Sequence, residues 1–334
     1  MTDVVAPPAR PLRRPRLPKV LGVAGPASGA LFALIILTIY NAIATNHFLV
    51  WSTLRVNLTQ VSTIVLVGVG MTLVIATGGI DLSVGSLMAI SGALAPLIFL
   101  SGRGPLGNPW VGIPVAIVVP ILIAGCFGLF NGVLVTRFRI QPIVATLVLF
   151  LGGRGIAGAL LHGKLKEFHN ANFEYIGQGR LFGIPVQVFV MAFVVILAAW
   201  AMRTTAFGRY ILATGGNEAA ARLAGVPVAR VRLMVYGISG LLSGLAGLIV
   251  IARLSSADPI NVGLNMELDA IAAAAVGGTV LTGGRATIFG TLIGAFLIHQ
   301  IRYTLISHGV ADGTTRMVTA GAIIFAVLLQ RRSH

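Results

Sequence analysis

The sequence predicts an all-α protein that crosses a lipid bilayer many times. Of its 334 residues, 56% are hydrophobic and only 10% are charged, whereas soluble domains carry about 25% charged residues. Apolar stretches without any charge, such as 31–40, 61–76 and 188–202, lie in segments near the roughly 20 residues that a spanning helix needs. These stretches are continuous, so they do not match the short alternating segments of a membrane β-barrel.

Hydropathy and helix-breaking residues divide the chain into about ten spans. They cover residues 22–44, 55–77, 82–100, 110–135, 142–162, 186–202, 231–252, 266–281, 286–307 and 314–330. We therefore expect one transmembrane domain over 21–330, preceded by a basic tail at 1–20 and followed by a short C-terminus at 331–334. The apolar part of the first span is longer than the 7 to 15 residues of a signal peptide's core, which favours an uncleaved first helix.

The charge distribution predicts the orientation of the chain. The net charge is +15, and most of the 24 basic residues fall in the tail and in the loops on one side of the predicted membrane. Because short loops rich in Lys and Arg stay in the cytoplasm, we expect both termini and the long loop 203–232 to be cytoplasmic. The basic residues are not clustered with interleaved aromatic residues, which argues against a nucleic-acid partner.

The long loop contains a segment with the signals of a short helix. Asn217 is a good N-cap, the residues after it are strong helix formers, and Gly225 followed by Pro227 ends the turn. Two interpretations stay open from these residues alone. The helix is either a coupling element that docks into a groove on a cytoplasmic motor subunit or an ordinary loop helix.

Two glycine-rich segments interrupt the hydropathy in the same way. Residues 78–85 and 277–284 align so that two glycines, a leucine, a Ser or Thr and a final glycine coincide. Such interruptions at corresponding positions of two halves indicate an internal repeat, and in transporters they often lie near the translocation path. The alternative is that glycine recurs here only to let membrane helices pack closely.

Five polar residues are candidates for lining a path. Thr53, Asn57 and Gln60 recur at helical spacing near one end of the second span, and hydroxyl-rich solutes need hydrogen-bond partners when they leave water. Helix-to-helix hydrogen bonding is the competing interpretation. Asp81 is interpreted first as a helix N-cap and second as a path residue, and Arg154 first as a structural hydrogen-bond donor and second as a gate.

The remaining ionisable residues do not form a reactive site in the sequence. Glu267 and Asp269 fall in the first turn of the eighth span, where the helix dipole stabilises carboxylates, so a structural role is preferred. His299 and Arg302 share a face of the ninth span but have too few acidic partners for a proton relay. The single cysteine, Cys126, excludes an internal disulfide, and no cluster with metal-ligand or nucleophile spacing is present, so we expect no catalytic residue and no metal site.

Several motifs, in order along the chain, resemble those of the ribose-type ABC sugar permeases, which are related to the branched-chain amino acid permeases. They are Gly79–Gly85, Gly215–Gly240, Ala252–Pro259 and the Glu267–Ile271 segment with its Gly-Gly-Thr end. The similarity covers nearly the whole chain after about residue 55, while the first 50 residues match poorly.

This resemblance implies the membrane subunit of a type II-like importer in the bacterial cytoplasmic membrane, with about ten spans. It also implies a second permease, identical or paralogous, two cytoplasmic ATPase modules and an extracytoplasmic sugar-binding protein. The loop that contacts the ATPase would comprise Gly216, Asn217, Ala220, Ala221, Arg222, Ala224, Gly225 and Val226.

ATP and Mg²⁺ are expected on the ATPase partner, and no cofactor on this chain. A phosphate-binding Walker A loop requires a Lys after its glycines, and the only lysines, Lys19, Lys164 and Lys166, lack that context.

Other solutes and mechanisms stay open. A branched-chain amino acid or a furanose-like signalling molecule could replace the sugar. An ion-driven secondary transporter would need paired ionisable residues at mid-membrane, and only Arg154 is expected to lie that deep. A membrane enzyme has no supporting cluster.

Overall fold

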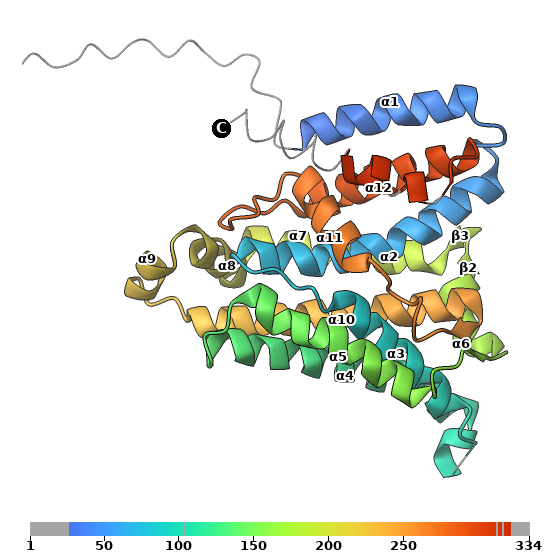
Figure 1. The fold of residues 1–334 in the computed structure, drawn as a ribbon, viewed down its shortest axis with the longest axis horizontal. Helices are drawn as coiled ribbons and strands as arrows, with labels where there is room; N and C mark the ends of the chain where they lie inside the picture. Colours follow the sequence, from blue (N-terminus) through green and yellow to red (C-terminus); the bar gives the residue numbers. More distant parts are fainter. Residues whose placement is uncertain (1–26, 103, 312, 316, 322–334) are drawn as a thin grey trace, which may run out of the picture.

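The computed structural model describes residues 27–321 except 103, 312 and 316, and it is helical almost throughout (Figure 1). The main helices are α1 (Ser28–Ala44), α2 (Trp51–Ala76), α3 (Val84–Phe99), α4 (Pro109–Thr136), α5 (Pro142–Leu160), α6 (Ala171–Gln178), α7 (Val186–Thr204), α8 (Ala206–Gly216), α9 (Glu218–Leu223), α10 (Val228–Leu254), α11 (Met266–Val276) and α12 (Ile288–Ser307). The predicted basic tail and the C-terminus 331–334 lie outside the described residues.

Short elements complete the chain between the helices. A 3₁₀ turn, η1, spans Gly104–Gly107. Strands β1 (Lys166–Glu167) and β4 (Ser256–Ala257) pair antiparallel, as do β2 (Arg180–Leu181) and β3 (Ile184–Pro185). Each strand has only two residues, so these pairs serve to hold connections in place.

Within the described residues, six helices are long and apolar enough to cross a membrane, namely α2, α4, α5, α7, α10 and α12. This confirms a polytopic helical membrane protein. The predicted count of ten is not confirmed, because the expected span 266–281 is the 11-residue helix α11 followed by a turn. At 1.5 Å per residue α11 is about 16 Å long, well short of a roughly 30 Å hydrocarbon core. Most of the expected span 314–330 lies outside the described residues.

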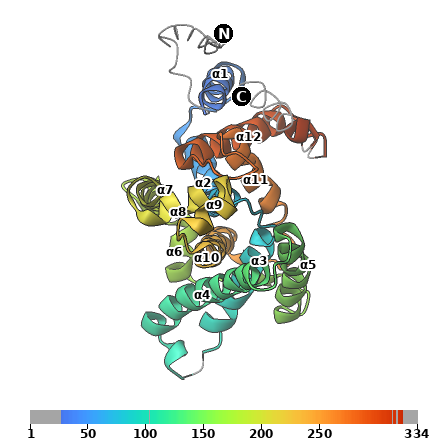
Figure 2. The same ribbon diagram turned by 90° about the vertical axis from the view of Figure 1, so that its left-hand side faces the viewer.

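Helices α2 and α10 form the centre of the fold. In the most apolar 18-residue stretch of each helix, 83% of the residues of α2 and 72% of those of α10 are buried. The corresponding shares for α4, α5 and α7 are only 33%, 28% and 22%. Figure 2 shows α1 and α12 above α2, α11 beside α2, α3 beside α10 and α4 below α10. The outer helices therefore expose apolar side chains, such as Phe193 and Ile196 of α7, on the surface of the chain, as is typical of membrane helices.

Among the described helices, α4 and α10 share the most extensive contact. A Cβ at Gly128 would lie 2.3 Å from the Tyr236 carbonyl oxygen, and one at Gly240 would lie 2.4 Å from the Ala124 carbonyl oxygen. Only glycine permits this approach of two backbones, as is common between membrane helices.

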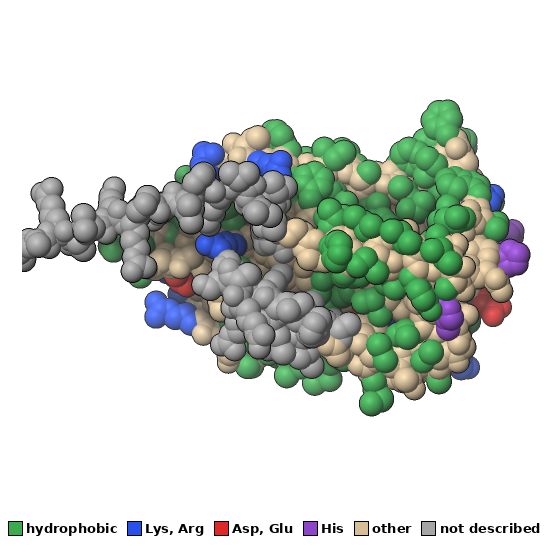
Figure 3. Space-filling model, turned by 90° about the horizontal axis from the view of Figure 1, so that it is seen from above, with side chains coloured by type: hydrophobic (Ala, Val, Ile, Leu, Met, Phe, Trp, Pro, Cys, Tyr) green, Lys and Arg blue, Asp and Glu red, His purple; other side chains and the backbone are tan. Residues whose placement is uncertain are grey.

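The molecule has two distinct ends. Helices α8 and α9 lie together at one end, called here the α9 end, and α6, β2 and β3 lie at the other, called the α6 end (Figure 1). In the face shown in Figure 3, charged side chains gather at the two ends, and hydrophobic side chains cover the region between them. This arrangement fits a protein that spans a bilayer with both ends in water.

Candidate functional site: the α9 end and two polar cavities

Helix α9 has the start and the end that its sequence predicts. Asn217 is the N-cap, and its side-chain oxygen accepts a hydrogen bond from the Ala220 N–H at 3.0 Å. After the helix, Gly225 has a φ of +79°, and the Val226 N–H returns to the Ala221 carbonyl oxygen at 3.0 Å. These hydrogen bonds make α9 a compact turn that keeps its shape, as Gly at a helix C-terminus commonly permits.

The surface of α9 includes a residue that sequence reasoning did not select. The Leu223 side chain is 91% exposed, while Ala221 on the opposite face is buried. The sequence did contain a signal, because Leu223 is the one large apolar residue in a six-residue helix of otherwise small or charged side chains. Its apolar side chain needs a partner surface to leave water.

An ion pair joins α9 to the membrane helices. Glu218 Oε2 lies 2.7 Å from Arg232 Nη2 of α10, and Glu218 Oε1 lies 2.6 Å from Arg222 Nη2 within α9. The hydrogen bond from Arg222, with the further bond from Arg232, holds the pKa of Glu218 below its usual value. Arg232 Nη2 also donates to the Thr77 carbonyl oxygen at 3.4 Å, so it reaches the end of α2.

Three glycine-containing segments meet beside α9, in a contact called here the glycine junction. It comprises Gly215 at the end of α8, Ala76 at the end of α2 and Gly283–Gly284 after α11. The Gly284 N–H donates to the Ala76 carbonyl oxygen at 3.0 Å. A Cβ at Gly215 would lie 1.9 Å from that same oxygen, so backbones touch here with no room for a side chain.

The two aligned glycine segments end their helices with the same geometry. Gly78 and Gly278 have φ angles of +81° and +95°. The Gly79 N–H bonds to the Val74 carbonyl oxygen at 3.1 Å, and the Thr279 N–H bonds to the Ala274 carbonyl oxygen at 3.0 Å, as in a Schellman motif. By backbone geometry, Gly78 is therefore equivalent to Gly278. The sequence alignment had matched Gly78 to Gly277, so the two differ by one residue.

Asp81 is buried in a polar network, and its interpretation as the N-cap is wrong. The N-cap of α3 is Ser83, two residues later. Asp81 Oδ1 accepts hydrogen bonds from the Ser83 N–H at 3.0 Å and hydroxyl at 2.6 Å, and Oδ2 accepts one from the Ser239 hydroxyl of α10 at 2.8 Å. Asn131 of α4 donates to the Ser83 hydroxyl at 2.8 Å. Three helices are thus joined here, because a buried carboxylate needs several donors to replace water.

Arg154 holds a loop in place. Its Nη1 donates to the carbonyl oxygens of Ile260 and Val262 at 2.8 and 3.1 Å. These carbonyls belong to the connection between α10 and α11. The contacts agree with the structural interpretation of Arg154. Neither Arg154 nor Asp81 lines the α2–α12 cavity described next or the second cavity described further below.

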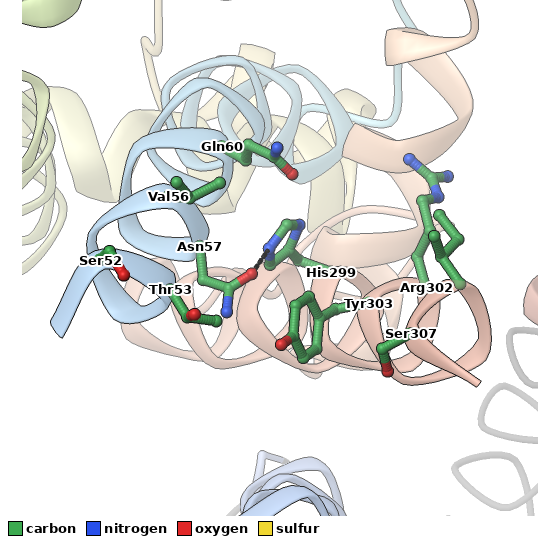
Figure 4. Close-up of a pocket in the computed structure, with 10 residues that line it drawn as sticks. Ser52, Thr53, Val56, Asn57, Gln60, His299, Arg302, Tyr303 and Ser307 are labelled. Atoms are coloured by element: carbon green, nitrogen blue, oxygen red, sulfur yellow. Dashed lines mark hydrogen bonds between the residues drawn. The ribbon is translucent and has the colours of Figure 1, made fainter. Parts of the chain in front are cut away.

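The polar stripe of α2 borders a cavity of about 470 Å³ near the α6 end, called here the α2–α12 cavity. Thr53, Asn57 and Gln60 face the His299 and Tyr303 side chains of α12 across it (Figure 4). Asn57 Oδ1 and His299 Nε2 are 3.0 Å apart, within hydrogen-bonding distance. The structure therefore brings the three predicted residues to one cavity, together with the two α12 residues predicted to share a face, His299 and Arg302.

Arg302 at the rim of this cavity is paired. Its two terminal nitrogens donate to the Asp269 carboxylate at 3.0 and 2.8 Å. Both Glu267 and Asp269 lie in the first turn of α11, as predicted. Sequence reasoning missed the ion pair, because the two residues are 33 positions apart. In the part of the chain that the structure describes, no three His, Cys, Asp or Glu residues are grouped to hold a metal.

Comparison with known proteins identifies the family. The profile of the branched-chain amino acid transport system / permease component family matches residues 53–328. The chain belongs to this permease family.

Several relatives of the permease are sugar transport proteins. It is 41% identical over 310 residues to the ribose import permease protein RbsC of Escherichia coli K12, covering 90% of this chain and 92% of that protein. It is 39% identical to the Bacillus subtilis 168 ribose import permease protein RbsC, covering 82% and 83%. It is 36% identical to the galactofuranose transporter permease protein YtfT of E. coli K12, covering 82% and 78%. No solved structure matches the chain.

The comparisons bear on one expectation about the N-terminal part of the permease. Its N-terminal 50 residues were expected to match poorly. The 90% of the chain covered in the E. coli ribose permease alignment exceeds what residues 53–334 can supply. The similarity therefore extends into the first 52 residues, although the family profile begins at residue 53.

Proposed function

We propose that this permease is the membrane subunit of an ATP-driven importer that moves a monosaccharide across the bacterial cytoplasmic membrane. The observation that carries the proposal is α9, a capped helix that exposes Leu223 and is tied by Glu218 to Arg232 of α10. Similarity to import permeases for ribose and galactofuranose supports the solute class. The complex would contain a second permease, two ATPase modules that bind ATP and Mg²⁺, and an extracytoplasmic binding protein that delivers the sugar.

Helix α9 is the proposed coupling helix on the cytoplasmic side. Its apolar Leu223 would insert into a groove of the ATPase, with Gly216, Asn217, Ala220, Arg222, Ala224, Gly225 and Val226 around it. Helices that place an apolar side chain in a partner's groove bind by burying that side chain. Both chain termini would then also lie in the cytoplasm.

Helix α2 is the proposed lever between coupling and transport. Its C-terminal end contributes Ala76 to the glycine junction, and its N-terminal turns line the α2–α12 cavity. The 26 residues of α2 extend over about 39 Å. A displacement of α9 would therefore shift the far end of a rigid helix, so that the cavity opens to alternate sides.

The α2–α12 cavity is the proposed entrance of the translocation path. Thr53, Asn57, Gln60 and His299 would exchange hydrogen bonds with sugar hydroxyls, which replaces the water that the sugar loses. Asp81 and Arg154 would act indirectly by holding α3, α10 and the loop before α11 in place.

A substitution of Leu223 tests the coupling proposal. Leu223→Asp should leave membrane insertion unchanged but lower ATPase co-purification and ATP-driven uptake at least tenfold, since an apolar anchor at an interface contributes about 2 kcal/mol or more. Leu223→Met is the matched control and should retain both. Ala221→Arg is less informative because Ala221 is buried and its replacement would also disturb α9. Normal uptake by Leu223→Asp would contradict the proposal.

Proteoliposomes test the energy source and the solute. Uptake of labelled ribose should require the complete complex and ATP on the side of the membrane that α9 faces, whether that side is inside or outside the vesicle. An ion gradient should not replace ATP. A panel with leucine and a furanose signalling molecule separates the alternative solutes. Uptake of ribose by the permease alone, driven by an ion gradient, would contradict an ATP-driven importer.

A further inference from the structure

A second cavity lies on the other side of the first turns of α2. Its volume is about 380 Å³, and α2, α6, β2, β3, α7 and the end of α10 surround it. Ser52, Val56 and Gln60 line both this cavity and the α2–α12 cavity. A solute near the beginning of α2 could therefore enter either of the two cavities.

The lining of this second cavity is strongly basic. Arg55 of α2, Arg180 of β2 and Arg253 of α10 all line it, and no Asp or Glu does. None of the three belongs to any ion pair among the described residues. Only Arg55 is partly engaged, since its Nε donates to the Trp51 carbonyl oxygen at 3.2 Å and its guanidinium lies 5.8 Å from the Trp51 ring centre. Three arginines that line one cavity without a counter-charge attract an anion.

Two buried polar atoms of lining residues lack partners. They are Arg253 Nη1, which can only donate, and Gln187 Oε1, which can only accept. The Gln187 amide is held in orientation because its nitrogen donates to the Gly177 carbonyl oxygen. Gln178 fixes the surroundings of Arg253 by donating to the carbonyl oxygens of Ala252 and Arg253 and to the Ser255 hydroxyl. A ligand that reaches these two buried atoms would therefore have to offer both an acceptor and a donor.

We infer that this cavity binds a sugar acid, with its carboxylate on Arg55, Arg180 and Arg253 and a hydroxyl donating to Gln187 Oε1. A neutral sugar would leave three positive charges without an anion. A simple inorganic anion would leave the Gln187 oxygen without a donor, which is costly in a buried position. The inference rests on the proposed import function and extends its substrate class to anionic sugars.

Binding to the full-length permease in phosphatidylcholine nanodiscs tests the inference. Isothermal titration with gluconate, glucose and sulfate should give a gluconate affinity at least tenfold higher than that of either other ligand. Arg253→Gln and, separately, the more accessible Arg55→Gln should each weaken gluconate binding about tenfold, as expected for the loss of a charge-assisted hydrogen bond. Arg209→Gln removes the same charge from an exposed position on α8 and should change nothing.

Four results would overturn the inference, of which three come from the titrations. They are equal affinity for gluconate and glucose, equal affinity for gluconate and sulfate, and unchanged binding in both arginine variants when circular dichroism shows native helix content. A thermal stabilisation by phosphatidylglycerol with no gluconate binding would assign the arginines to a lipid head group and also overturn it. These titrations need neither ATPase nor binding protein, so a failure of ATP-driven uptake of ribose is a separate result.

Discussion

The two ends of this permease are built differently. At the α9 end, backbones touch directly at the glycine junction, and a single carboxylate, Glu218, links α9 to Arg232. At the α6 end, polar side chains border two cavities on either side of α2. The first arrangement is rigid and suits the transmission of movement. The second leaves space and hydrogen-bonding groups for a solute, so the two proposed functions lie at opposite ends of α2.

The largest expected effect comes from filling the glycine junction. Gly215→Ala should abolish uptake and lower the free energy of unfolding by about 1 to 3 kcal/mol, because its Cβ would lie 1.9 Å from the Ala76 carbonyl oxygen and force the backbones apart. Uptake in proteoliposomes and the thermal midpoint in detergent measure both effects. Gly155→Ala on α5 is the control, since its Cβ would meet no atom within 4 Å. Equal behaviour of the two variants would contradict a tight junction.

A smaller effect is expected from the ion pair at the same end. Arg232→Gln should lower uptake severalfold while ATPase assembly persists, because Glu218 and the Thr77 carbonyl oxygen both lose their link to α10. Arg222→Gln removes the exposed partner of Glu218 and should lower uptake less than Arg232→Gln does, since surface ion pairs contribute at most about 1 kcal/mol. Uptake and co-purified ATPase, measured together, separate coupling from assembly. A greater loss in Arg222→Gln would reverse the assignment.

The pH dependence of this ion pair follows from the lowered pKa of Glu218. A carboxylate with a lowered pKa in the folded state adds stability above its unfolded pKa of about 4.3, and this stability is lost as pH falls through the folded pKa. Coupling measured as uptake per ATP hydrolysed should therefore not change between pH 7 and about 5.5. A decline within that window that Glu218→Gln abolishes would show that Glu218 titrates there.

The smallest effect is expected at the α2–α12 cavity. Asn57→Ala should lower sugar uptake about two- to fivefold with normal assembly, because one hydrogen bond to a neutral group contributes roughly 0.5 to 1.5 kcal/mol. Initial uptake rates at several sugar concentrations are the measurement. Thr38→Ala is the control, since Thr38 is exposed on α1 and bonds only to the Leu34 carbonyl oxygen of its own helix. Identical rates in both variants would place the path elsewhere.

Local signals in the sequence predicted much of the α9 end. The Asn217 cap and the Gly225 terminator act within a few residues, so pattern reasoning found α9 correctly. The exposure of Leu223 was missed because a leucine is usually taken as buried. At the α6 end, helical spacing predicted that Thr53, Asn57 and Gln60 share a face, and the structure places all three at one cavity.

Hydropathy was a weaker guide where helices are short. The segment 266–281 has the composition of a span, yet α11 ends at Val276, because Gly278 adopts a positive φ. Asp81 precedes α3 as a capping residue would, but its carboxylate is oriented by Ser239 of α10, 158 positions away. Neither outcome can be read from a window of neighbouring residues.

Composition and local pattern by themselves determined that this chain is a polytopic helical membrane protein with a capped helix in its longest basic loop. These properties depend on the transfer of apolar residues from water and on hydrogen bonds between near neighbours. Only the tertiary structure decided that Gly215, Ala76 and Gly284 touch, that Arg302 pairs with Asp269, and that three arginines share a cavity. The reason is that such contacts depend on how whole helices pack, and residues far apart in sequence meet only after that packing is set.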